Sequence, residues 1–98
     1  MTLNAQTRGM LEQIIDNVKK DIHKMAKLFL NPNSKAQLHI EKENDFVLGV
    51  AVGIIQQTFI MSFFSMYGRL SNEEENSEVG GIVFRRLAEV RDEIFKAG

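Results

Sequence analysis

Hydrophobic residues recur at steps of three and four along residues 11–29, a spacing that places them on one face of a helix. The opposite face is polar, and its lysines gather toward the C-terminal half, where the helix dipole favours positive charge. The Asn-Pro-Asn-Ser sequence at residues 31–34 ends this pattern, because proline cannot continue a helix and biases the preceding residue away from helical geometry. We therefore predict an amphipathic helix over residues 4–30.

Residues 46–68 contain no charged side chain, and apolar residues occupy every side of a helix drawn through them. Asn44 or Asp45 is suited to cap the start of this helix, and Gly68 is suited to end it. We predict a second helix over residues 44–67. A helix that is apolar all round is either buried in an assembly or located in a membrane.

A third apolar stripe, at steps of four, four, three and four, predicts a helix over residues 71–96. Ser71 and Glu74 have the spacing of a capping box at its start. Gly80 and Gly81 lie inside the pattern, and each costs about 1 kcal/mol relative to alanine in a helix interior. We expect the helix to continue through them. The stripe consists of Val79, Val83, Leu87, Val90 and Ile94.

Residues 35–43 allow two interpretations. Ala36, Leu38 and Ile40 alternate with polar residues, as in a short half-buried strand, which would need a partner strand from a second copy. The same segment is also compatible with a helical turn that starts from a Ser34 cap.

Together these elements predict an all-α fold, a three-helix chain in a single domain with its hydrophobic helix at the centre. A chain of 98 residues with no cysteine has a small core and no disulfide to support it. We therefore expect the helical bundle to be completed by homo-oligomerisation, as a homodimer or a higher oligomer. The predicted interface lies on the central helix, at Gly49, Gly53, Gln56, Gln57, Ile60, Phe63 and Phe64.

The polar residues in this central helix sharpen the prediction. Gly49 and Gly53 have the four-residue spacing that lets two helices approach closely. Gln56 and Gln57 are amides that need hydrogen-bond partners if they are buried. Across a symmetric interface they can bond to another copy and fix its register, as a buried asparagine does in coiled coils.

A membrane span at about residues 46–67 is the alternative, because about 20 apolar residues cross a bilayer. Two observations argue against it. Gln56 and Gln57 fall in the middle of the segment, where lipid cannot satisfy their amides. The seven basic residues before the segment and the five after it give no clear orientation.

The composition limits the chemistry. A net charge of −1 excludes the strongly basic class of nucleic-acid binders, and 44% hydrophobic residues exclude a disordered chain. His23 and His39 are not spaced as metal ligands, and no nucleophile–base pair or phosphate-binding loop is present. We predict a non-enzymatic protein without catalytic, cofactor-binding or metal-binding residues.

A basic surface on the first helix leaves one further alternative. Its lysines could contact an acidic partner, anionic lipid or nucleic acid, as in a small helical regulator, although a solvated helix face explains them more simply. The N-terminal sequence lacks the features of a secretory signal, so we expect a cytoplasmic protein. The expected function is a protein–protein interaction or scaffold module. The lysines are Lys19, Lys20, Lys24 and Lys27.

Overall fold

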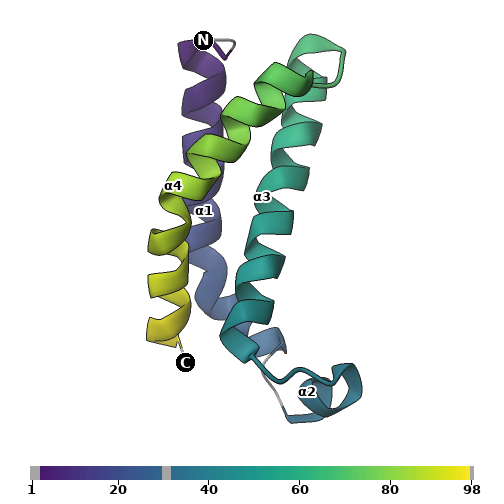
Figure 1. Cartoon of the computed structure of the whole chain (residues 1–98), viewed down its shortest axis with the longest axis vertical. Helices are drawn as coiled ribbons and strands as arrows, with labels where there is room; N and C mark the ends of the chain where they lie inside the picture. Colours follow the sequence, from purple (N-terminus) through teal and green to yellow (C-terminus); the bar gives the residue numbers. More distant parts are fainter. Residues whose placement is uncertain (1–2, 30–31, 98) are drawn as a thin grey trace.

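Three helices of 25 residues run side by side along the molecule: α1 (Ala5–Phe29), α3 (Glu43–Tyr67) and α4 (Glu73–Ala97) (Figure 1). A short helix, α2 (Pro32–Leu38), lies at the end where α1 is linked to α3. This computed structural model describes residues 3–29 and 32–97, and its elements over those ranges are all helices. The all-α prediction is therefore confirmed.

The long helices begin and end close to the predicted bounds, and α4 continues through Gly80 and Gly81 as expected. Leu30, the predicted last residue of the first helix, lies outside the described residues. The strand interpretation of residues 35–43 is wrong, and the predicted count of three helices omits α2. Pro32 begins this short helix, because proline is tolerated in a first turn, whose N–H groups have no helical partner.

The helix ends show which capping residues act. Gly68 ends α3 in the left-handed conformation, with φ 67°, and donates a hydrogen bond to the carbonyl of Phe64. The capping box of α4 lies one residue later than predicted. The side chain of Asn72 accepts from the N–H of Glu75 at 2.8 Å, and the Glu75 carboxylate accepts from the N–H of Asn72 at 2.9 Å. Asn44 and Asp45 do not cap α3, which starts after Lys42 without a side-chain cap.

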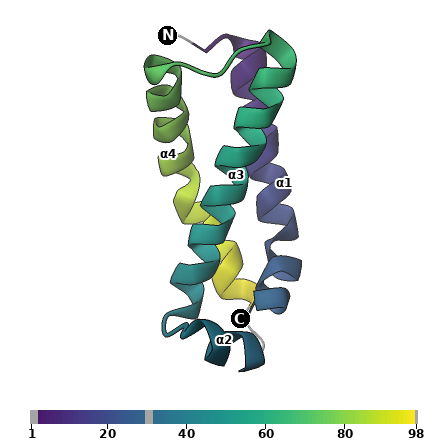
Figure 2. The ribbon, with the colours of Figure 1, turned by 90° about the vertical axis from the view of Figure 1, so that its right-hand side faces the viewer.

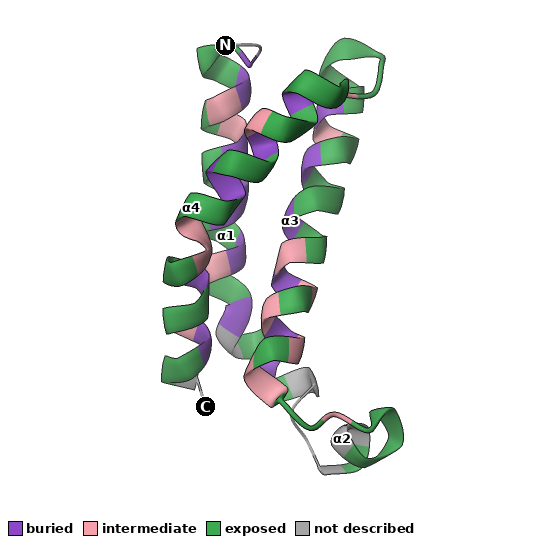
Figure 3. Ribbon diagram, in the orientation of Figure 1, coloured by how far each residue is buried: buried purple, intermediate pink, exposed green. Residues whose placement is uncertain are grey.

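One core lies between the three long helices (Figure 3). Residues at steps of four along α3 turn inward and pack against the apolar stripes of α1 and α4. The outer surface of α3 stays exposed over most of its length, as Figure 3 shows. The inward residues of α3 are Val47, Ala51, Ile55, Phe59 and Phe63.

Ion pairs connect α1 to α4 on the outside of the bundle. The guanidinium of Arg86 on α4 contacts Asp16 of α1 at 2.6 Å and Glu89 of its own helix at 2.9 Å. Glu89 in turn accepts from Lys19 of α1 at 3.0 Å. Seen from the side, α3 lies in front of this pair, and α4 passes behind α3 toward α1 (Figure 2). Helix α3 packs against α1 and α4 through the apolar residues on its inward side.

Candidate interaction surface

Helix α3 is covered on one side only. Gly49, Gly53, Gln57 and Met61 follow one another at steps of four along its exposed side, and all four are in water. Large apolar residues flank this line, and Met61 and Phe64 are 63% and 54% exposed. We call this surface the α3 face. It consists of Gly49, Gly53, Ile54, Gln56, Gln57, Ile60, Met61 and Phe64, none of which is charged.

The structure brings six of the seven predicted interface residues together on the α3 face. Phe63 is the exception, because it continues the inward line of α3 and is only 2% exposed. Its ring lies 4.6 Å from that of Tyr67, centroid to centroid, and the Arg69 guanidinium lies 5.0 Å from its centroid. Phe63 therefore belongs to the chain's own core and is not available to a second copy.

The two glutamines are exposed in the single chain, so neither amide is buried unless another molecule covers it. The two glycines have no packing role inside the chain. A Cβ atom added at Gly49 or Gly53 meets nothing within 4 Å, so no neighbour in the molecule requires glycine there. Close contacts at these positions can come only from outside the chain.

Two residues of the α3 face, Ile54 and Met61, were not predicted. A second exposed apolar surface, on α4, was not predicted either: Phe84 and Phe95 are 76% and 57% exposed. Both phenylalanines lie outside the inward stripe of α4. This position in the sequence pattern is the signal that could have identified them as exposed. A groove with a volume of about 260 Å³ separates α3 from the first half of α4. Its lining residues are Gln56, Phe59, Ile60, Asn76, Val79 and Gly80.

No family model, curated protein or solved structure matches this chain.

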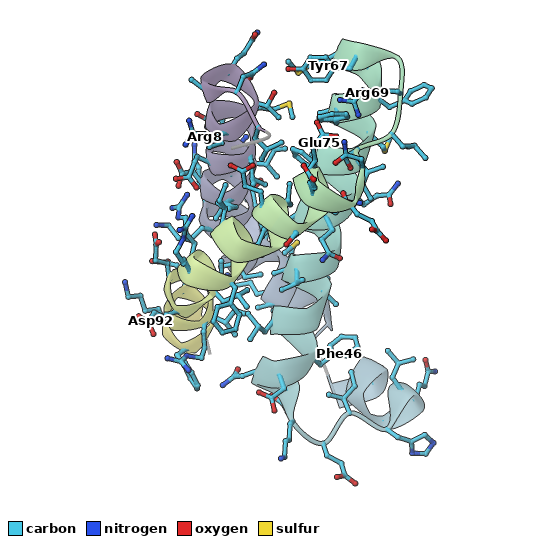
Figure 4. The ribbon with its side chains drawn as sticks, turned by 45° about the horizontal axis from the view of Figure 1, so that its top comes forward. Arg8, Phe46, Tyr67, Arg69, Glu75 and Asp92 are labelled. Atoms are coloured by element: carbon cyan, nitrogen blue, oxygen red, sulfur yellow. The ribbon has the colours of Figure 1, made fainter. Side chains whose placement is uncertain are left out.

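The polar groups at the turn between α3 and α4 are satisfied by one another. Arg69 donates two hydrogen bonds to the Glu75 carboxylate, at 2.9 and 3.0 Å, and the two side chains lie together at this turn in Figure 4. These bonds, with the one from the N–H of Asn72, lower the pKa of Glu75, and the same carboxylate raises the pKa of Arg69. Tyr67 shares a 2.6 Å hydrogen bond with Thr7 of α1. This cluster fixes the turn between α3 and α4.

The predicted basic surface is divided in the structure. Lys19 is paired with Glu89, whereas Lys20, Lys24 and Lys27 are exposed along α1. Within the described residues, no group of three or more potential metal ligands comes together. His39 is exposed next to α2, and the side chain of His23 lies outside the described part of the chain.

Helix α3 is also long and apolar enough to cross a membrane. Only 28% of its most apolar 18-residue window is buried inside the bundle. A core helix of a soluble protein is usually covered more completely than this. Most of this window is therefore in contact with the surroundings of the chain.

Proposed function

We propose that this protein is a non-enzymatic helical interaction module that self-associates through the α3 face. The observation that supports this proposal is the α3 face itself, an exposed, charge-free surface on the most apolar helix of the chain. Contiguous apolar surfaces of this kind mark interaction sites in soluble proteins.

The area of the α3 face suits a dimer. Its four large apolar side chains leave on the order of 400 Å² of surface in water, which is within the ~300–600 Å² range of the largest patch on an ordinary monomer. With the intervening glycines and glutamines, the face comes to roughly 600 Å² per copy, so two copies that covered it completely would bury about 1,200 Å², the lower limit for a stable specific interface. The four side chains are Ile54, Ile60, Met61 and Phe64.

The polar residues of the α3 face fit a protein partner better than lipid. Gln57 lies in the middle of the face, where an amide buried without a partner costs about 1–3 kcal/mol. Gln56 and Gln57 of a second copy supply both donors and acceptors, whereas lipid tails supply neither. The two glycines let the second backbone approach closely.

The flanking helices argue against a membrane span. Helix α1 runs beside α3, and α4 starts next to the end of α3 and crosses toward α1 (Figure 1); the outer faces of α1 and α4 are charged. Arg86, Asp16 and Glu89 form their ion pairs in the middle of these helices. Insertion of the whole bundle would place these charges in hydrocarbon at high cost. A soluble, cytoplasmic oligomer avoids that cost.

The experiment that tests the proposal compares two matched variants, Met61→Glu and Leu70→Glu. Both side chains are large, apolar and exposed, at 63% and 64%, but Leu70 lies in the turn after α3 and outside the α3 face. Each new carboxylate faces water in the single chain, so both variants should keep their helix content. Met61→Glu buries an unpaired charge in the interface and should weaken self-association by at least tenfold.

Sedimentation velocity and light scattering over a dilution series give the dissociation constants. Leu70→Glu should associate like the parent protein. Equal association constants for Met61→Glu and the parent would show that the α3 face is not the interface.

A further inference from the structure

The outer side of α4 is a second surface that nothing in the chain covers. Its residues are all exposed, and Phe84, at 76%, is the most exposed of the large hydrophobic residues that the structure describes. We call this surface the α4 face. It follows steps of three and four along one side of the helix: Glu73, Ser77, Gly80, Phe84, Ala88 and Arg91.

The α4 face is complementary to the same face of a second copy that runs in the opposite direction. Gly80 and Phe84 lie at equal distances before and after the level of Ile82, and so do Glu73 and Arg91. A two-fold axis at that level turns α4 onto an antiparallel copy of itself. Each Phe84 then lies over Gly80 of the second copy, and each Glu73 lies opposite Arg91. From this symmetry we infer that the α4 face binds the α4 face of a second copy in antiparallel orientation.

The sizes of the residues support this arrangement. A Cβ atom added at Gly80 or Gly81 meets nothing within 4 Å, so the backbone there is bare and accessible. The groove beside Gly80 has a volume of about 260 Å³, and cavities of about 150 Å³ accommodate benzene. The ring of Phe84 from a second copy therefore fits over Gly80, on the α4 side of this groove.

The charges support the same orientation. Neither Glu73 nor Arg91 forms an ion pair with another residue in the described part of the chain. Both lie about 13 Å along the helix from the proposed axis, and a crossing angle near 20° keeps opposite side chains within reach there. A parallel arrangement would instead place Glu73 against Glu73, Arg91 against Arg91 and Phe84 against Phe84.

This contact is separate from the proposed contact through the α3 face, since the two faces lie on different helices. A chain that uses both self-complementary faces assembles beyond a dimer. The α4 contact is therefore best measured in the Met61→Glu background, which removes the proposed contribution of the α3 face and leaves α4 intact.

Two substitutions in that background test the inference. Gly80→Leu fills the place of the incoming ring, and Phe84→Ala removes the ring. Each should raise the dissociation constant of the remaining dimer by at least about tenfold. In the single chain the Gly80→Leu side chain points into open space, and leucine is a better helix former than glycine. The melting temperature of the monomeric variant should therefore equal or exceed that of the monomeric background. Phe95→Ala, which removes the same ring about 20 Å from the axis, is the matched control and should associate like the background.

Mixing the two variants gives the sharpest result. In a mixed dimer, Phe84 of the Gly80→Leu chain meets the free Gly80 of the Phe84→Ala chain, and the other site holds leucine opposite alanine. The mixture should therefore associate more strongly than either variant alone.

Reversing the charges tests the proposed ion pair. Glu73→Arg should weaken the dimer, and adding Arg91→Glu should restore it. Glu74→Arg, which makes the same charge change on the next residue, is the control. The inference is overturned if the Met61→Glu background is monomeric, if Gly80→Leu and Phe84→Ala leave its association unchanged, or if mixing restores nothing.

Discussion

Arg86 connects α4 to α1 through two ion pairs. Its side chain is 17% exposed and reaches Asp16 and Glu12 on α1 as well as Glu89 on α4. The hydrogen bond from Arg86, followed by that from Lys19, lowers the pKa of Glu89 to about 2. The charged form of Glu89 is thus favoured by folding.

This shift predicts how stability depends on pH. Because the pKa of Glu89 is lower in the folded than in the unfolded chain, its contribution is fully present above about pH 4.5 and is lost as the pH falls toward 2. Glu89→Gln should therefore reduce the fall in melting temperature between pH 5 and pH 2. Thermal melts followed by circular dichroism measure this slope. The control is Glu74→Gln, an exposed carboxylate with no ion pair among the described residues. Identical slopes for Glu89→Gln and the parent would contradict the assignment.

At the level of the helices, the start of α4 provides a test of local structure. Asn72 caps the helix, whereas Ser71, the residue that the sequence pattern indicated, has its hydroxyl bonded to the exposed side chain of Asn76. Asn72→Ala should lower the free energy of unfolding by about 1 kcal/mol, and Ser71→Ala should lower it less. Urea unfolding of the two variants gives both values. A larger loss for Ser71→Ala would restore the original capping prediction.

The sequence predicts the long helices well because α1 and α4 are amphipathic and the ends of the charge-free segment are clear. It does not predict which side of α3 faces inward. Phe63 and Phe64 are adjacent and chemically identical, yet one is buried and the other is 54% exposed. The packing of α1 and α4 decides between them, and the polar signal in the sequence is Gln57, which lies seven residues before Phe64 on the same, exposed side of α3. The exposed phenylalanines of α4 were not predicted, because the sequence does not show whether a neighbouring element covers an apolar residue outside the inward stripe.

At the level of the whole molecule, the three long helices enclose one core and leave apolar surface outside it. The ion pairs hold α1 against α4, so α3 contributes one side to the core and presents the other to its surroundings. Burying the exposed side offsets the shortage of core expected for a chain of this size. The proposed self-association is therefore what the fold leads us to expect, as well as the proposed function.

The central claim, that a second copy covers the exposed side of α3, is tested most directly by the mass of the unmodified protein in detergent-free buffer. Sedimentation equilibrium over a wide concentration range is the measurement. We predict a soluble protein with a mass of at least two chains of 11.2 kDa, which falls toward that of one chain on dilution. A mass of one chain at every concentration, or recovery only with membranes, would contradict the account.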